Sequence, residues 1–348
     1  MTALVLIVIL GVSISIHELG HYLAARLQGV RVPAFSVGFG PPLLRVRWKG
    51  TEWRLSLIPL GGYAEIEGMV PDFSPGAQRS ELKRGYAGLT FFGKALVLLG
   101  GVMMNLLLAW LLMAWTYTAG GLPVPVEDRA QIVEVIPGSL AAEIGFKKGD
   151  VIVAIDGRPL EKFTDINQIK KTIGVHTVTL LRDGEKLTLK IYWSGERDKL
   201  GVRYGPELHY RYPGFGEAFV MAVKTSLRFL PDMLQSFVKG LSGVLVGKPS
   251  PDIVGPVGIV NLAGQAARAG FLAVLRLAAL INLSLAVFNL LPIPGLDGGR
   301  LFLLFLNVLS GGRIRPEHEA LVNFIGFAFL ILLMLLVTLQ DVQRLLGG

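Results

Sequence analysis

The residues best suited to chemistry lie near the start of the chain, in the segment His17-Glu18-Leu19-Gly20-His21. Residues four apart on an α-helix lie one above the other on the same face, so the imidazoles of His17 and His21 can approach a single metal ion. Glu18 lies beside the first histidine and can reach a water molecule on that metal and accept its proton. The spacing therefore predicts a Zn²⁺ site with His17 and His21 as ligands and Glu18 as the catalytic residue.

The sequence around this motif is apolar. Glu18 is the only Asp, Glu, Lys or Arg in residues 1–25, and no basic residue precedes the apolar run. A cleavable signal peptide has a basic region before its apolar core, so we expect a retained membrane-spanning helix instead. Ionisable groups within a spanning helix are costly and usually functional, which favours a metal site over an accidental match to the pattern.

The composition indicates an integral membrane protein. Of the 348 residues, 52% are hydrophobic and 17% are charged, and the mean hydropathy is +0.55. The formal net charge of +8 is spread over several loops, so we expect contact with the lipid bilayer and its anionic head groups, and none with nucleic acid. Because the chain has no cysteine, a metal must be held by His, Asp or Glu.

Four segments are apolar and long enough to cross a bilayer, at approximately 2–25, 95–119, 272–295 and 320–340. Ten Lys or Arg residues lie in 26–94 and three lie in 297–319. Basic loops stay in the cytoplasm, so these two stretches are predicted to be cytoplasmic. Both termini and residues 120–270 are then expected on the outer side of the membrane.

A third metal ligand is expected at the end of the third span. The first and third spans run in the same direction, so the cytoplasmic end of each lies at a similar depth. Asp297 is the first charged residue after twenty uncharged ones, and Pro292 and Pro294 interrupt the preceding helix. A catalytic zinc usually has three protein ligands, and Asp297 is the predicted third.

The segments between the spans have patterns of their own. In "LLRVRWKGTEWRLSLI", apolar and basic residues alternate on either side of Gly50, which predicts a β-hairpin at the cytoplasmic rim of the membrane. Its edge offers backbone groups to another chain. Residues 214–248 are amphipathic with helical spacing, which predicts a helix on the membrane surface, bent at Pro231, or alternatively one packed on the neighbouring soluble domain.

A small α+β domain is predicted between the second and third spans. From Gln131 the pattern is a strand, a short helix near Ser139, another strand, a helix at about 164–173 and a hairpin. The segment "PGSLAAEIGFKKGDVIVAIDG" resembles a bacterial PDZ domain over about 131–204, and a generic small α/β domain is the alternative. The remaining histidines, His176, His209 and His318, are expected to face solvent, and Glu65 and Glu67 are expected to be structural or surface residues.

The "HELGH" segment, the PDZ-like module and "NLLPIPGLDGG" (residues 289–299) together resemble the site-2 protease family, over nearly the whole chain. These are intramembrane zinc metalloproteases, and the likeness is to bacterial regulators of sigma-factor signalling. The resemblance implies a multi-pass protein of the bacterial inner membrane with a cytoplasmic-side active site. It implies Zn²⁺ as cofactor, and Asn289, Pro292 and Pro294 as substrate-binding residues. It also implies that the β segment receives substrate as an added strand.

The implied activity is regulated intramembrane proteolysis. Substrates would be single-pass membrane proteins, such as an anti-sigma factor or remnant signal peptides, already shortened by another protease in some cases. A single PDZ module, where well-known relatives have two, is a departure from the family pattern. Two alternatives stay open, a catalytically silent PDZ-containing membrane scaffold and a metal transporter. Intact Glu18 and Asp297 argue against the first, and nearly apolar outer halves of the spans argue against the second.

The predicted fold class is thus an α-helical membrane protein with about four transmembrane helices, a cytoplasmic-side membrane-associated β-hairpin or sheet, and an inserted extracytoplasmic PDZ domain. The predicted order is helix 1 with HExxH (1–25), β segment and loop (26–94), helix 2 (95–119), PDZ domain (120–212), amphipathic helix and linker (213–271), helix 3 with LDGG (272–299), and a cytoplasmic loop with helix 4 (300–348).

Overall fold

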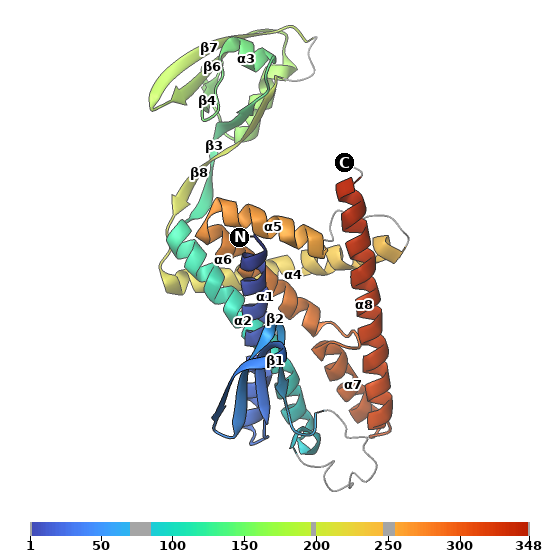
Figure 1. Ribbon diagram of the computed structural model, residues 1–348. Coiled ribbons are helices and arrows are strands. Elements are labelled where there is room, and N and C mark those ends of the chain that lie inside the picture. The colour runs from blue at the N-terminus through green and yellow to red at the C-terminus, as the bar shows by residue number, and fades with distance from the viewer. Residues whose placement is uncertain (1, 70–84, 196–199, 246–254, 347–348) are drawn as a thin grey trace. The chain divides into compact units, whose positions relative to one another are not determined.

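A computed structural model of the protein describes residues 2–69, 85–195, 200–245 and 255–346 (Figure 1). The chain divides into two compact units. We call Met1–Gly120 together with Gly214–Gly348 the membrane unit, and Gly121–Pro213 the inserted unit. Part of the predicted cytoplasmic loop, residues 70–84, lies outside the described residues.

The membrane unit is mainly helical. Its helices are α1 (Thr2–Leu27), α2 (Phe91–Gly120), α4 (Phe215–Leu245), α5 (Pro256–Ala269), α6 (Phe271–Leu290), α7 (Asp297–Leu309) and α8 (Pro316–Leu346), with a short 3-10 helix η2 (Gly85–Gly88). Among the described residues, four helices are apolar and long enough to cross a membrane, namely Thr2–Leu27, Phe91–Gly120, Phe271–Leu290 and Glu317–Gln343. The predicted four apolar helices are thereby confirmed.

The third spanning helix is shorter than the sequence predicted. Helix α6 ends at Leu290, and α7 begins at Asp297, so Asp297 starts a second helix instead of ending the first. Leu291, the residue before Pro292, has extended backbone angles, and Pro292 and Pro294 have no N–H to donate, so the helix does not continue past Leu290. Two further stretches predicted as linker or loop also form helices. Residues 256–269 form α5, which begins with a proline in its first turn, and residues 300–309 belong to α7.

Helix α2 is the centre of the membrane unit and packs against α1, α4 and α6. It lies very close to α1 where Gly20 and Gly100 face one another. Only glycine permits this approach, since a Cβ on either residue would strike the other helix's backbone. Val97, Leu98 and Val102 on α2 are buried in this packing. Helix α8 instead exposes many large apolar side chains, as expected of a surface that contacts lipid.

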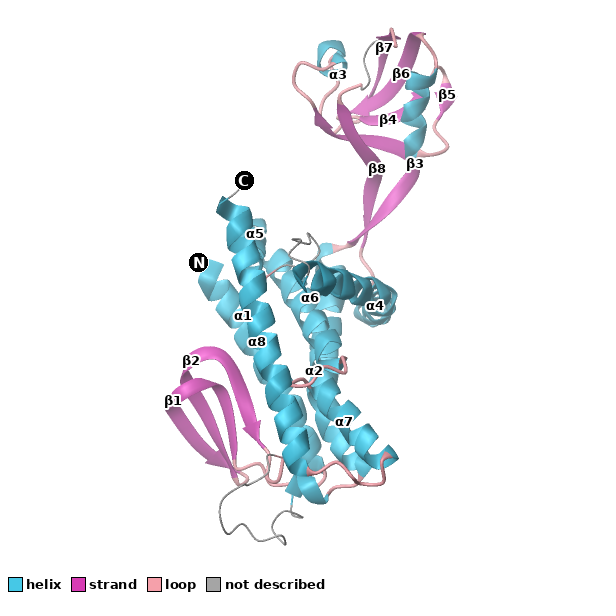
Figure 2. Ribbon diagram, turned by 90° about the vertical axis from the view of Figure 1, so that its right-hand side faces the viewer, coloured by secondary structure: helices cyan, strands magenta, loops and turns pink. Residues whose placement is uncertain are grey.

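The predicted hairpin is present and longer than expected. Strands β1 (Ala34–Trp48) and β2 (Thr51–Glu65) are antiparallel and lie beside α1 (Figure 2), and Lys49 and Gly50 make the turn with φ of 48° and 80°. Both strands bend, so Phe35 pairs with Trp53 on one side and with Ala64 on the other. The bends divide the two strands into four short segments, which we call ribbons. They lie side by side in the order 62–65, 34–37, 52–55 and 44–48. Segment 62–65 lies at one edge of this sheet, and we call it the edge ribbon.

The inserted unit is a six-stranded antiparallel sheet with two short helices. The strands are β3 (Leu122–Val135), β4 (Val151–Ile155), β5 (Arg158–Pro159), β6 (Gly174–Arg182), β7 (Glu185–Trp193) and β8 (Val202–Arg211), in the order β7-β6-β4-β3-β8 with β5 against β4. Helix α3 (Leu140–Ile144) has Ser139 as its N-cap. The helix expected at 164–173 is a 3-10 helix, η3 (Phe163–Lys171).

One expectation for the inserted unit was wrong. His176 does not face solvent, since its side chain is 9% exposed and is held between Asp156 and the carbonyl of Thr172. Side chains alternate between the two faces of β6, and His176 lies on the same face as Val178, which points into the apolar core with Ile152. His209 agrees with the expectation, with a side chain that is 63% exposed.

Candidate metal centre

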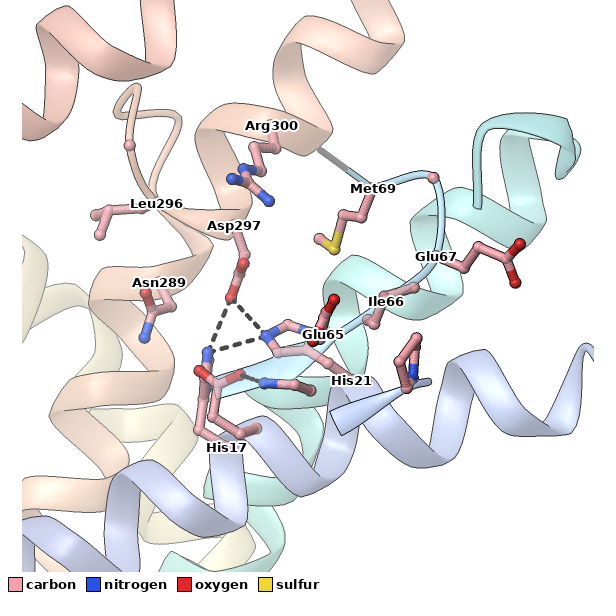
Figure 3. Close-up of a pocket in the computed structure, with 15 residues that line it drawn as sticks. His17, His21, Glu65, Ile66, Glu67, Met69, Asn289, Leu296, Asp297 and Arg300 are labelled. Atoms are coloured by element: carbon pink, nitrogen blue, oxygen red, sulfur yellow. Dashed lines mark hydrogen bonds and ion pairs between the residues drawn. The ribbon is translucent and has the colours of Figure 1, made fainter. Parts of the chain in front are cut away.

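The three predicted metal ligands converge within the membrane unit (Figure 3). The Nε2 atoms of His17 and His21 are 3.1 Å apart, and Asp297 Oδ2 lies 3.0 Å from the first and 3.4 Å from the second. The two histidines are buried on α1, and the aspartate comes from the first turn of α7, far from them in the sequence.

Local backbone geometry brings Asp297 to the histidines. The break after Leu290 turns the chain, and Gly298 and Gly299 let the start of α7 fold back against it. A Cβ at Gly298 would strike the backbone of Leu290 and Leu291, and one at Gly299 would strike that of Ile293. These two glycines therefore permit the close approach of α7 to the chain segment before it.

The donor set fits a zinc ion. Tetrahedral zinc with bonds of 2.0–2.1 Å has ligand atoms about 3.3 Å apart, which is close to the three separations given above. Asp297 Oδ2 is buried and makes no hydrogen bond of good geometry among the described residues. A buried carboxylate oxygen without such a bond is costly, and a cation beside it removes that cost. Two imidazoles and one carboxylate also leave a fourth position open for water.

The second ring nitrogen of each histidine faces α2. Nδ1 of His21 lies 2.8 Å from the carbonyl oxygen of Val97, so it carries the proton and leaves Nε2 free for a metal. Nδ1 of His17 lies 3.4 Å from the side-chain amide of Asn105, which is fully buried. Gly101 lies between these two contacts, and a Cβ there would come within 2.6 Å of both rings.

Glu18 is placed beside the ligands and is partly buried. Its Oε2 accepts a hydrogen bond of 3.1 Å from the backbone N–H of Ala64, in the edge ribbon 62–65. Glu18 and Ala64 both line a cavity that also contains the three ligands. The carboxylate thus has one oxygen tied to the sheet and stands where a base for a metal-bound water would be needed.

The cavity has a volume of about 600 Å³, large enough for a short stretch of extended peptide. Its lining includes Asn289, the loop before α7, the first turn of α7, and the segment that continues from the edge ribbon. Pro292 and Pro294 are not among its lining residues and act on it by ending α6. Sequence reasoning had not assigned Arg300, Glu65 and Glu67 to the site, yet they line the cavity.

Comparison with known proteins identifies the family. The model of the family described as peptidase family M50 matches residues 5–333, which is nearly the whole chain. The chain belongs to peptidase family M50. This confirms the predicted site-2 protease family and, with it, a zinc metalloprotease.

Full-length bacterial relatives support the assignment. The zinc metalloprotease RasP of Bacillus licheniformis is 28% identical over 99% of both chains. The regulator of sigma-W protease RasP of Bacillus subtilis is 27% identical, again over 99% of both chains. A protein of Fusobacterium nucleatum is 31% identical over 99% of both. The likeness therefore includes the inserted unit as well as the helices.

Proposed function

We propose that this metalloprotease cuts peptide bonds within transmembrane segments of other membrane proteins, with zinc held by His17, His21 and Asp297. One observation carries the proposal: three ligand atoms from distant parts of the chain lie within 3.4 Å of one another, beside a glutamate, in a unit of bilayer-spanning helices. Ligands buried among such helices suit a substrate that is itself embedded in lipid.

In this proposal Glu18 is the general base and afterwards the general acid. A bound zinc would polarise the scissile carbonyl and lower the pKa of its water to about 7. Glu18 accepts the proton of that water on its carboxylate and returns it to the departing amine. The hydrogen bond from Ala64 fixes the direction of the carboxylate, so that its other oxygen is available for the proton.

The edge ribbon 62–65 is the proposed docking site for substrate. A transmembrane helix must unwind before its carbonyls can be attacked, and the unwound backbone then needs new hydrogen-bond partners. Ribbon 62–65 has a strand partner on one side only among the described residues, and it continues into the cavity wall. Asn289 stands on the opposite wall and is proposed to hold the unwound segment by its amide.

The inserted unit is proposed to be a PDZ domain that faces the outside of the bacterial inner membrane. Its two short helices and antiparallel sheet suit that assignment, and it contains an apolar cavity of about 160 Å³ between η3 and β8. Either capture of a new C-terminus or exclusion of bulky ectodomains is compatible with it. Because a relative is named regulator of sigma-W protease, an anti-sigma factor shortened by another protease is the proposed class of substrate.

The test is the Glu18→Gln variant in detergent and in proteoliposomes. It should bind as much zinc as the wild type and leave a transmembrane peptide uncut, because only the proton acceptor is removed. Continued cleavage would remove Glu18 from the proposed role.

A wild-type protein without zinc would support the silent scaffold, and zinc flux across proteoliposomes would support the transporter. A comparison of membrane proteomes from cells carrying either form would identify substrates, since these accumulate uncut beside Glu18→Gln.

A further inference from the structure

Asn105 lies beside the proposed metal ligand His17, and its side-chain amide lacks one hydrogen-bond partner among the described residues. The side chain of Asn105 is fully buried on α2, and its Nδ2 lies 3.4 Å from His17 Nδ1. Its Oδ1 is also buried and has no hydrogen-bond partner within the described part of the chain. A buried amide with an unpaired oxygen beside a candidate metal ligand requires a physical explanation.

The tautomer of His17 supplies that explanation. A neutral imidazole has one N–H and one lone pair, and a metal at Nε2 takes the lone pair. Nδ1 must then carry the proton and needs an acceptor, which an amide nitrogen is not. Rotation of the Asn105 amide by 180° exchanges its two ends and brings Oδ1 to Nδ1.

We propose that Asn105 is a positioning residue of the zinc site, whose amide oxygen accepts the Nδ1–H of His17 and holds Nε2 toward the metal. This inference rests on the proposed zinc site and deepens it. Asn105 does not touch the metal or the substrate. It acts through His17, as carboxylates and carbonyls do for other metal-bound histidines.

The arrangement on α2 supports the proposal, because both histidines are held by one stripe of that helix. Val97, Gly101 and Asn105 follow one another at intervals of four, so they share one face. The carbonyl of Val97 accepts from His21, and Gly101 has no side chain to separate the rings from the helix. Asn105 completes the series with the acceptor for His17. The nearest polar group of α2 to His17 Nδ1 among the hydrogen bonds found is the side chain of Asn105, one turn beyond Gly101.

Asn282 on α6 is a matched control. It is 1% exposed, its Nδ2 donates to Ser13 Oγ and to the carbonyl of Ala278 at 2.8 Å, and its Oδ1 is also unpaired among the described residues. It thus has the same type, burial and helix context as Asn105. It differs in having no contact with either histidine ring among the bonds found.

The test measures zinc affinity of the full-length protein in detergent by competition with a chelator, together with the visible spectrum of the Co²⁺ form. Asn105→Leu should bind zinc about 10-fold to 100-fold more weakly than wild type and change the Co²⁺ spectrum. Asn105→Asp, which keeps an acceptor for Nδ1–H, should stay within about threefold of wild type, as should Asn282→Leu. If Asn105→Leu does not fold, Asn105→Ala replaces it in the same comparison.

Two results would overturn the inference. The first is wild-type zinc affinity in the Leu or Ala variant, and the second is an Asp variant as weak as these. The His17→Ala variant separates this failure from failure of the zinc site itself. If wild-type protein binds no more zinc than His17→Ala, the proposed function fails and the role of Asn105 fails with it. If the wild type binds zinc more tightly than His17→Ala, and the Asn105 variants bind it as tightly as the wild type, the zinc site is supported and Asn105 has no part in it.

Discussion

Asp297 is the one proposed zinc ligand that does not come from α1; it lies in the first turn of α7. Its Oδ2 is buried beside two imidazoles and lacks a hydrogen bond of good geometry in the described residues, so the position is best explained by a shared cation. Replacing Asp297 with Ala should weaken zinc binding by more than about 100-fold, because loss of a ligand costs more than loss of a ligand's supporting partner. Chelator competition measures this. Asp232→Ala on the exposed face of α4 should bind zinc as wild type does, and equal binding by both variants would mean that another group is the third ligand.

At the residue scale, the sequence predicted the groups whose chemistry follows from local spacing or unusual surroundings. His17, Glu18 and His21 share one helix, and Asp297 is the first charge after a long apolar run. Asn105 and Arg300 gave no such signal. A single Asn in an apolar helix has many uses, and its contact with His17 depends on how α2 rotates against α1. That rotation is set by packing at Gly20 and Gly100, which no local pattern specifies.

At the element scale, the fit of α2 against α1 depends on Gly101. A methyl group there would come within 2.6 Å of His17 Cε1 and of His21 Nε2, well inside van der Waals contact. Gly101→Ala should therefore push the rings aside and lower zinc affinity at least about tenfold, even though alanine favours the helix. Gly216→Ala in the first turn of α4 meets nothing within 4 Å and is the control. Wild-type zinc affinity in Gly101→Ala would show that α2 does not fix the histidines.

His176 ties three elements of the inserted unit together, and its stability contribution should depend on pH. Its ring lies 2.8 Å from the carbonyl of Thr172 after η3 and 2.8 Å from Asp156 in the β4–β5 turn. The Thr172 carbonyl and then the Asp156 carboxylate raise the pKa of His176 above 6.5 despite burial. Folding thus favours the protonated ring. Its stabilisation is complete below pH 6.5 and is lost as pH rises through the raised pKa.

Asp156 acts in the opposite direction. The hydrogen bond from His176, helped by the Thr177 N–H, lowers the pKa of Asp156 below 3.8, so its contribution is complete above pH 3.8 and is lost as pH falls through the lowered pKa. The inserted unit should resist heat-induced proteolysis best between about pH 4 and pH 6.5. In the wild type this resistance should decline as the pH rises toward about 9. The decline should be smaller in His176→Gln than in the wild type, and as large as in the wild type in His209→Gln. An equal decline in all three proteins would contradict the assignment.

Elements with strong periodicity or turn chemistry were predictable, and those that depend on packing were not. The spanning helices and the Lys49-Gly50 hairpin followed from apolar length and alternation. Residues 300–309 of α7 were read as loop because they follow a Pro-rich break and lie in the stretch 297–319, which contains three Arg residues. Strand β1 contains Gly38 and Gly40 with φ of 89° and 86°, and β2 contains Gly61 with φ of 116°, where the strands bend. A local pattern does not show which of the resulting ribbons then pair.

At the scale of the whole molecule, chemistry and substrate selection are proposed to reside in separate units. All groups placed at the metal centre lie in the membrane unit, and they come from α1, α2, α6, α7 and the β1–β2 sheet. The inserted unit has its own apolar core and its own buried ion pair, in which Arg182 binds Asp150 through two hydrogen bonds of 2.7 and 2.8 Å. A unit with an independent core can be removed without opening the core of the other.

The ends of the inserted unit make this separation testable. Leu122 pairs with Arg211 in the β3–β8 ladder, and paired Cα atoms are about 5 Å apart, so a Gly-Ser linker of about four residues can replace residues 121–213. The shortened protein should bind zinc and cut a bare transmembrane peptide at nearly the wild-type rate, because the metal centre is untouched. Its preference for a shortened substrate over one with an intact ectodomain should fall about tenfold, or 1.4 kcal/mol in relative kcat/KM. Competition between the two substrates in proteoliposomes measures the preference. Loss of cleavage of the bare peptide, with zinc still bound, would show that the inserted unit takes part in hydrolysis itself.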